Sequence, residues 1–296
     1  MNRTKVGVLG IGAIGSLISY LLRSNKEIEL AFYNRSIKND IHLKFLEDEI
    51  NFPISIDNDL KKAVELDWLI ICLKEHHYKY AKHWFKNVIS PKTKVAIIRN
   101  GLNLKAPILD YTAEKNILEC IIEAPTQAIS INHYEVLAKP IITLPQLQLA
   151  KSFSELFKSD NIQIKYTDDF KTASWKKISE ASALGAILCL TGETCRVFKY
   201  KKLRTLYIEI LKETMKVAKA DGAIFNDGYI EEMLQKLDNY SPNKGSSMLT
   251  DRLNGNPIEI NAKNGIISKM GKKHNIRTPL NDTLVTLLKF VNHRNF

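Results

Sequence analysis

The chain has 296 residues, of which 45% are hydrophobic, so it can bury a large core and favours two domains over one. No apolar run approaches the ~20 residues of a membrane-spanning helix, and the four cysteines lack metal-type spacing, which predicts reduced thiols in a cytoplasmic protein. The net charge of +11 comes from scattered lysines rather than from a continuous basic run. This pattern favours a solvated surface over nucleic-acid binding, and it suits an anionic cofactor and an anionic small substrate.

The first half of the chain alternates between strand and helix patterns. Residues 13–24 carry apolar side chains at helical spacing. Nearly continuous apolar runs predict strands at 5–11, 28–34, 67–74 and 94–101, with further strands in 117–145. Such runs belong to parallel strands that helices cover on both faces. We therefore predict an α/β fold with a doubly wound, Rossmann-type parallel sheet as the first domain, residues 1–166.

Residues 8–15, VLGIGAIG, place three glycines at the spacing of a phosphate-binding turn. Gly10 permits the tight turn, Gly12 lets the backbone approach a pyrophosphate, and Gly15 lets the helix pack closely on the strand. The helix N-terminus then offers N–H groups to phosphates. A tight turn without a ligand is the alternative, but the flanking strand and helix are the context that the motif requires. We predict a dinucleotide site here.

The end of the second predicted strand, FYNRS, distinguishes between the two nicotinamide dinucleotides. NAD sites usually carry an acidic residue at this end, bonded to the ribose 2′-hydroxyl. Here Asn34 occupies the position and Arg35 follows. A carboxylate would repel a 2′-phosphate, whereas an arginine can bind it through two hydrogen bonds. The pattern favours NADP(H), with a solvated loop arginine as the alternative reading of Arg35.

Two further strand ends are predicted to face the same cleft. Lys74 closes the strand at 67–74, and Asn100 precedes Gly101 at the end of the strand at 94–101. Ligands of doubly wound sheets bind beyond the carboxyl ends of the strands. Lys74 could meet a phosphate or ribose and Asn100 could meet the nicotinamide ribose or the substrate, although each residue taken singly is more often an ordinary loop residue.

The second half of the chain is dominated by long helical patterns. They predict an all-helical domain at 167–296, with Thr167 or Asp168 capping its first helix. The expected helices lie at 169–190, 200–221, 226–238, 257–273 and 278–291.

These motifs together resemble the ketopantoate reductase (2-dehydropantoate 2-reductase) family over the whole chain. The resemblance rests on the glycine motif, Lys74, the Asn100–Gly101 pair, Trp175-x-Lys177, and SSMLTDRLNGNPIEINAKNG at 246–265 followed by Thr278–Pro279. The last stretch is the most specific of these motifs. The family reduces a 2-oxo acid with NADPH in the synthesis of pantothenate.

The resemblance also implies roles for individual residues. The catalytic lysine of the family falls on Lys177, its catalytic glutamate on Glu259 and its substrate-binding serine on Ser247. Its cofactor-binding residues fall on Gly10, Gly12, Gly15, Arg35, Lys74 and Asn100. No metal is implied.

The chemistry of the reaction agrees with these roles. Reduction of a 2-oxo acid delivers hydride to carbon and a proton to oxygen. A cation near the carbonyl oxygen stabilises the developing alkoxide, and a partly buried lysine can act as the acid. A nearby carboxylate can hold that lysine or bind a substrate hydroxyl. We expect Lys177 and Glu259 to lie on two helices in these roles, whereas Lys176, about 100° around the helix, is read as a surface charge.

The sequence departs from the family pattern one and two helical turns beyond Lys177. The family usually carries substrate-binding asparagines on this face, but this chain has Ala181 and Gly185. We expect a wider and less polar pocket floor, with Glu180 close enough to pair with Lys177. The true substrate therefore stays open. The histidines His76, His77 and His83 are read as a solvated helix start rather than a metal site.

The sequence thus predicts an NADPH-dependent reductase of a branched 2-oxo acid, with 2-dehydropantoate (ketopantoate) as the favoured substrate. A D-2-hydroxyacid dehydrogenase acting on another branched 2-oxo acid is the first alternative. A non-catalytic NADP-binding protein of the same fold is the second, although retention of both Lys177 and Glu259 argues against it. A small anionic 2-oxo acid is the expected partner, without nucleic acid or membrane. The sequence leaves a homodimer and the physiological direction open.

Overall fold

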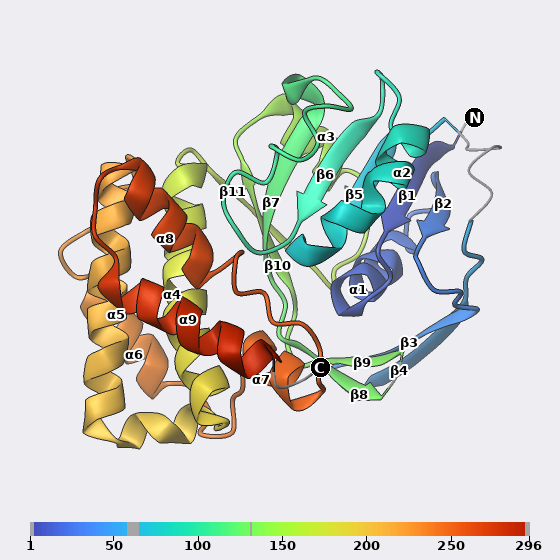
Figure 1. Cartoon of the computed structure of the whole chain (residues 1–296). Helices are drawn as coiled ribbons and strands as arrows, with labels where there is room; N and C mark the ends of the chain where they lie inside the picture. Colours follow the sequence, from blue (N-terminus) through green and yellow to red (C-terminus); the bar gives the residue numbers. More distant parts are fainter. Residues whose placement is uncertain (1–2, 58–64, 131, 294–296) are drawn as a thin grey trace. The chain divides into compact units, whose positions relative to one another are not determined.

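A computed structural model describes residues 3–57, 65–130 and 132–293 (Figure 1). The chain separates into two compact units. The first contains residues 1–99 and 103–168, and the second contains residues 100–102 and 169–296. The short segment 100–102 therefore leaves the first unit and joins the helical one, which becomes important at the candidate site.

A seven-stranded sheet organises the first unit, with strand order β11-β10-β7-β6-β5-β1-β2. Neighbouring strands from β7 to β2 are parallel, as expected, but β10 runs antiparallel to β7, so the sheet is mixed rather than wholly parallel. The bounds are β1 Thr4–Leu9, β2 Ile28–Tyr33, β5 Trp68–Ile71, β6 Lys94–Ile98, β7 Ile117–Glu123, β10 Ile141–Pro145 and β11 Gln163–Thr167.

Both faces of this sheet are covered, as the apolar runs predicted. Alternate residues of a strand point to opposite faces, so β5 directs Trp68 and Ile70 to one core and Leu69 and Ile71 to another. The first core includes apolar residues of α1 (Ala13–Leu22) and α3 (Gln148–Ser154). The second includes residues of α2 (Tyr78–Val88), which follows the short 3₁₀ helix η2 (Glu75–His77). The doubly wound α/β prediction is confirmed.

A second, four-stranded sheet was not predicted. Its order is β4-β3-β9-β8, and its bounds are β3 Asp40–Phe45, β4 Asp48–Pro53, β8 Thr126–Ser130 and β9 His133–Val136. In β3 the residues Ile41, Leu43 and Phe45 are buried and their neighbours are only partly so, the alternation of a strand with one face on a core. This small sheet packs into the core on the α1 side of the larger sheet.

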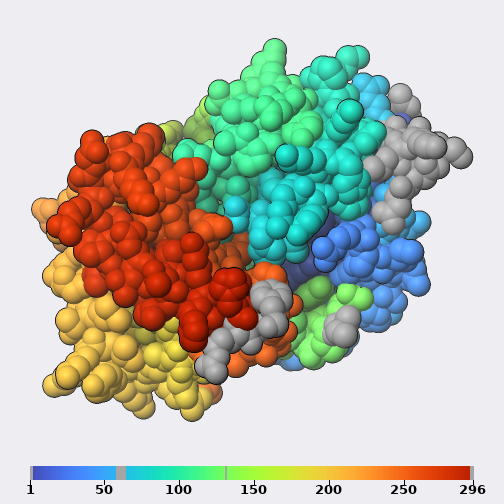
Figure 2. Space-filling view, in the orientation of Figure 1, coloured from blue at the N-terminus to red at the C-terminus, as the bar shows by residue number. Residues whose placement is uncertain are grey.

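Helices build the second unit in the residues described. They are α4 Phe170–Thr191, α5 Lys201–Ala220, α6 Tyr229–Asp238, α7 Ser247–Leu253, α8 Asn264–Lys273 and α9 Pro279–His293, with the 3₁₀ helix η4 at Cys195–Lys199. Helices α8 and α9 form one continuous surface, in red (Figure 2). The N-cap of α4 is Asp169, whose side chain accepts from the N–H of Thr172, so the prediction of Thr167 or Asp168 is wrong by one or two residues.

The predicted helix at 257–273 begins only at Asn264, and α7 was not expected at all. Asn264 is fully buried, and its side-chain amide donates to Asn281 Oδ1 over 3.0 Å and to the carbonyl of Ser182 over 3.5 Å. Glu213 accepts from the backbone N–H groups of Leu280 and Asn281, just after Pro279 opens α9. These bonds join α4, α5, α8 and α9 and give Asn264 a structural role.

Candidate active site

The glycine turn after β1 has the geometry that the spacing predicted. Gly10 has φ +94° and donates its N–H to the carbonyl of Tyr33 over 2.8 Å. A Cβ on Gly15 would lie 1.9 Å from the carbonyl oxygen of Gly10, so only glycine lets the helix approach this closely. A Cβ on Gly12 would meet nothing within 4 Å. The turn is tight at Gly10 and Gly15 and open at Gly12, where a phosphate would approach.

The N-terminus of α1 is built as an anion site. Its N-cap is Gly12, which has no side chain to bond the first N–H groups of the helix. Asn34 Oδ1 accepts from the N–H of Ile11 over 3.1 Å, which holds the turn against the end of β2. Lys38 Nζ donates to the carbonyl of Ile11 over 2.5 Å. Burial lowers the pKa of this lysine.

Lys38 was missed by sequence reasoning. The stretch NRSIK does contain a second cation three residues after Arg35. The sequence alone does not show that this loop folds back onto the glycine turn. Arg35 itself is exposed. Lys74 is half-buried at the N-cap of η2, three residues after β5, so the predicted strand ends earlier than Lys74. The glycine turn, the helix N-terminus and these basic residues fit a dinucleotide phosphate group.

In the helical unit, Trp175 anchors the start of α4. Its ring is fully buried, and its Nε1 donates to Asp221 Oδ2 over 3.0 Å. Asp221 also bonds His274 Nε2 at 2.8 Å, so the carboxylate ties α4 to the end of α8. Burial raises the pKa of Asp221, but the bonds from Trp175 and His274 outweigh that effect and the pKa is lowered. The first residue of the Trp175-x-Lys177 motif is thus held in place.

The two adjacent lysines of α4 lie in different surroundings. Lys176 holds its ammonium 5.7 Å from the centre of the Tyr229 ring, and its carbonyl accepts from the Tyr229 hydroxyl. Lys177 is half-buried and contributes to lowering the pKa of Glu180. The two side chains therefore diverge as the helix period requires.

Asn100 and Glu259 are brought together, although they are far apart in the sequence. Asn100 Nδ2 donates to Glu259 Oε2 over 3.0 Å. Glu259 is 5% exposed, and its Oε1 is buried without a hydrogen-bond partner among the described residues. The expectation that Glu259 lies on a helix is wrong, because it sits in the irregular stretch between α7 and α8. That stretch lets its carboxylate reach Asn100.

Glu180 has other bonds than the predicted one to Lys177. Its carboxylate accepts from Lys236 Nζ over 2.7 Å and from the Tyr240 hydroxyl. Burial raises the pKa of Glu180, but Lys236 and Tyr240 more than offset this and the net pKa is lowered. Glu180 is thereby anchored to α6 and to the tyrosine that follows it.

The floor of the Lys177 face differs from what the sequence predicted. Ala181 is half-buried and Gly185 is buried. A Cβ on Gly185 would lie 2.8 Å from Met248 Sδ and 3.8 Å from Lys263 Nζ. The expectation of a wider, less polar floor is therefore wrong at Gly185, because Met248 fills the space and the ammonium of Lys263 lies next to it.

Ser247, the predicted substrate-binding serine, lies beside this floor. It is exposed at the first position of α7, and its Oγ accepts from Lys263 Nζ over 2.9 Å. Lys263 was not predicted as a site residue. Its neighbours in the sequence, Ala262 and Asn264, gave no sign that the lysine would be buried.

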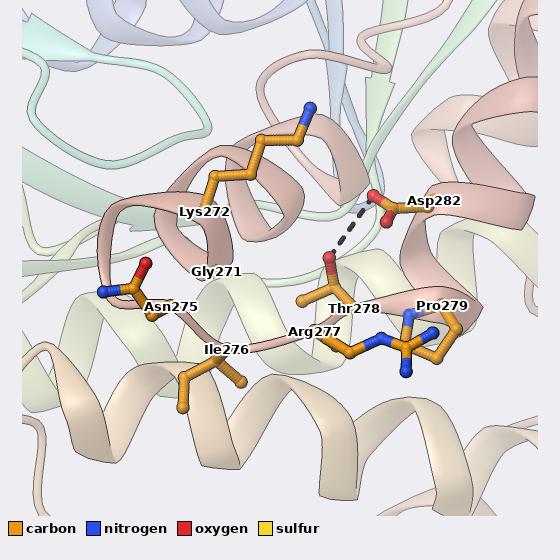
Figure 3. Close-up of a pocket in the computed structure, with 8 residues that line it drawn as sticks. All are labelled: Gly271, Lys272, Asn275, Ile276, Arg277, Thr278, Pro279 and Asp282. Atoms are coloured by element: carbon orange, nitrogen blue, oxygen red, sulfur yellow. Dashed lines mark hydrogen bonds between the residues drawn. The ribbon is translucent and has the colours of Figure 1, made fainter.

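A surface pocket lies elsewhere in the helical unit, at the turn between α8 and α9 (Figure 3). Lys272, Arg277 and Asp282 line it, and Thr278 donates to Asp282 over 3.3 Å. The described residues that line this pocket include none of the predicted site residues. Within the described part of the chain, His76, His77 and His83 belong to no group of three or more potential metal ligands, and no helix is long and apolar enough to cross a membrane.

Comparison with known families decides the classification. Residues 6–148 match the family model described as "Ketopantoate reductase PanE/ApbA", and residues 169–292 match "Ketopantoate reductase PanE/ApbA C terminal". The chain belongs to the ketopantoate reductase family. The matching ranges run through both units, including the glycine turn, Lys177 and Glu259. The protein is an oxidoreductase that acts on a CH–OH group and takes a nicotinamide dinucleotide.

Curated relatives of this ketopantoate reductase family member are similar over nearly their whole length. The 2-dehydropantoate 2-reductase of Caulobacter vibrioides is 23% identical and matches over 96% of this chain and 98% of its own. That of Mycobacterium tuberculosis is 24% identical over 96% and 97%.

Solved structures share the fold. A dimeric ketopantoate reductase from Staphylococcus aureus has a TM-score of 0.88 at 20% identity, covering 99% of this chain and 100% of its own. A ternary structure of D-mandelate dehydrogenase with NADH and anilino(oxo)acetate has a TM-score of 0.89 at 19% identity, covering 99% of both chains.

Proposed function

We propose that this protein is an NADPH-dependent reductase of a branched 2-oxo acid, and that it converts 2-dehydropantoate (ketopantoate) to pantoate in pantothenate and coenzyme A biosynthesis. The observation that carries the proposal is the bond between Asn100 and Glu259, which holds a buried carboxylate with one oxygen still able to accept. A buried acceptor of this kind suits a substrate hydroxyl, because a polar atom that stays unbonded away from water is costly.

The proton chemistry rests on Lys177. The bound dinucleotide supplies the hydride that reaches the C2 carbon of the 2-oxo acid. As that bond forms, the C2–O double bond becomes a single bond, and its electron pair goes to oxygen. Lys177 Nζ stabilises this developing charge and transfers a proton to it, leaving a neutral amine that is reprotonated from solvent. Glu259 orients the substrate or the lysine, and Ser247 and Asn100 bind substrate.

The cofactor preference rests on the end of β2. Asn34 uses its carbonyl oxygen to hold the turn and carries no negative charge that would repel a 2′-phosphate. Arg35 is exposed and Lys38 bonds the same turn, so two cations are available near a bound ribose. Gly10, Gly12, Gly15 and Lys74 complete the site in the first unit. The second unit supplies the catalytic and substrate-binding residues. One of them, Asn100, is also assigned to the cofactor.

A second candidate is a D-2-hydroxyacid dehydrogenase acting on another branched 2-oxo acid. The observation that favours it is the presence of Ala181 and Gly185 on the Lys177 face, where hydrogen-bonding side chains would select a substrate hydroxyl. The likeness in fold to a protein named D-mandelate dehydrogenase supports this candidate.

A panel of 2-oxo acids tests both candidates. The unmodified protein is mixed with NADPH and, in turn, ketopantoate, ketoisovalerate and phenylglyoxylate, and the nicotinamide absorbance is followed. The main proposal expects the highest kcat/KM with ketopantoate. A higher value for ketoisovalerate or phenylglyoxylate supports the second candidate, and absence of turnover with every acid contradicts both.

A further inference from the structure

Lys263 is a buried lysine whose ammonium is directed at an exposed serine. The residue is 2% exposed and lies immediately before α8, yet its Nζ donates to Ser247 Oγ over 2.9 Å. Lysine is rarely buried to this extent, because removing its charge from water is expensive. Some favourable interaction must therefore offset that cost at this position.

Met248 and the Lys263 ammonium both lie against Gly185. A side chain there would begin 3.8 Å from Lys263 Nζ and 2.8 Å from Met248 Sδ. Gly185 lies on the same side of α4 as Lys177 and Ala181, two turns further along the helix. Met248 thus fills the space where a side chain at 185 would begin, and the ammonium of Lys263 lies within van der Waals contact of that space.

The direction of the hydrogen bond matters. An ammonium can only donate, so Ser247 Oγ must accept. The hydroxyl proton of Ser247 is then left to donate to a further acceptor, and a positive charge lies directly behind the oxygen. Such a pair favours an anionic acceptor over a neutral one, because charge-assisted hydrogen bonds are roughly twice as strong.

Helix α7, which begins at Ser247, also carries two charged residues, Asp251 and Arg252. Asp251, 6% exposed, lies one turn after Ser247 on α7, and Arg252 Nη1 bonds the carbonyl of Leu190 at 3.1 Å. Burial raises the pKa of the Cys189 thiol to about 11, while Arg252 and Lys263 act to lower it and Asp251 acts to raise it. The alternative is that Lys263 only balances the charge of buried Asp251. The experiment therefore distinguishes a structural role from a role in substrate binding.

We infer that Lys263 is a positioning residue for substrate recognition, and that through Ser247 it presents a charge-backed hydroxyl donor to the carboxylate of the 2-oxo acid. This inference rests on the proposed function, in which Ser247 contacts the substrate. It adds a cation to the floor where the family usually places asparagines, so the site selects the acid group of the substrate more strongly than its hydroxyl group.

The test compares Lys263→Met, which removes the charge and keeps the length, with Lys269→Met, an exposed lysine of α8. For Lys263→Met we expect KM for the 2-oxo acid to rise about tenfold or more, with kcat within about threefold and KM for NADPH unchanged. Lys269→Met should leave all three unchanged. A lowered thermal midpoint with unchanged KM would identify a structural counter-charge and overturn the inference.

A double variant tests the path through Ser247. If Lys263 acts through that hydroxyl, then Lys263→Met combined with Ser247→Ala raises KM little more than Ser247→Ala alone. If the increases in KM of the two single variants multiply in the double variant, the inference is overturned.

Binding of oxamate, an unreactive 2-oxo acid analogue, separates this inference from the proposed function. Calorimetric titration into the NADPH-loaded protein should give a dissociation constant about tenfold weaker for Lys263→Met than for the unmodified protein. If oxamate shows this loss but no 2-oxo acid is reduced, the proposed function fails and the inference holds. Equal affinities, or no binding to the unmodified protein, would overturn the inference.

Discussion

Gly12 in the turn after β1 and Gly185 in α4 both leave a predicted binding surface without a side chain, but the consequences are opposite. Around Gly12 a Cβ would meet nothing within 4 Å, so the space is left for a ligand and the backbone provides the donors. Around Gly185 the space is taken by Met248 and Lys263. A glycine in a binding motif can therefore make room for a ligand or for another part of the protein.

The largest expected effect concerns the chemistry assigned to the α4 face. Lys177→Ala should lower kcat by roughly 10²–10⁴-fold, because the proton donor and the charge that stabilises the alkoxide are both lost. NADPH binding, which we assign to the turn, should stay nearly intact. Steady-state kinetics and an NADPH fluorescence titration measure the two quantities.

Lys176→Ala is the matched control, since its ammonium lies by the Tyr229 ring. It should change kcat little. If Lys176→Ala were the damaging variant and Lys177→Ala the mild one, the assignment of the catalytic face would be wrong by one residue.

The next largest effect is expected when Gly185 and Gly12 are each replaced by leucine. Gly185→Leu should lower the free energy of unfolding by about 1–3 kcal/mol, because the new side chain overlaps Met248 and Lys263. Gly12→Leu should change it by less than about 1 kcal/mol, the scale of a helix N-cap effect. NADPH affinity should show the reverse order, with a large loss for Gly12→Leu and little for Gly185→Leu.

Thermal unfolding monitored by circular dichroism, together with NADPH titration, measures both outcomes. Equal losses of stability in the two variants would remove the contrast between an open and a filled glycine site.

A smaller effect sharpens the account of the turn. The unmodified protein should bind NADPH at least about tenfold more tightly than NADH, which is about 1.4 kcal/mol. Arg35→Ala should narrow that gap by weakening NADPH alone, since only NADPH carries the 2′-phosphate. Titration of both dinucleotides is the measurement, and equal affinities in the unmodified protein would contradict the argument from Asn34 and Arg35.

The smallest expected effect concerns the choice of substrate. Because Ala181 and Gly185 supply no hydrogen bond to a substrate hydroxyl, the kcat/KM values for ketopantoate and ketoisovalerate should lie within about tenfold of each other. A preference for ketopantoate above roughly a thousandfold, about 4 kcal/mol, would contradict this prediction and would mean that the Glu259 carboxylate is enough to select the hydroxyl without the two missing side chains.

The parts that could be predicted from the sequence are those in which local pattern and function coincide. VLGIGAIG predicted a turn because the glycines, the strand and the helix are all consecutive. The apolar runs predicted the central strands for the same reason. The small sheet was missed, since β3 pairs with β9 and these two strands lie about 90 residues apart in the sequence.

The candidate site of the helical unit depends on contacts that no local pattern contains. Glu259 meets Asn100 across 159 positions, and Lys263 meets Ser247 across 16. A lysine in a helical pattern is usually solvated, so the burial of Lys263 could be recognised only once α4, α7 and α8 were packed together. The family resemblance identified Lys177, Glu259 and Ser247 but gave no reason to consider Lys263.

The most direct test of the central claim is a single-turnover reaction of the NADPH-loaded protein with ketopantoate, with the nicotinamide absorbance followed and the product identified by mass spectrometry. The account predicts that the absorbance falls in step with the formation of pantoate, one molecule for each NADPH consumed, and that Lys177→Ala slows this step by roughly 10²–10⁴-fold. An absorbance that stays constant while ketopantoate is recovered unchanged would contradict it.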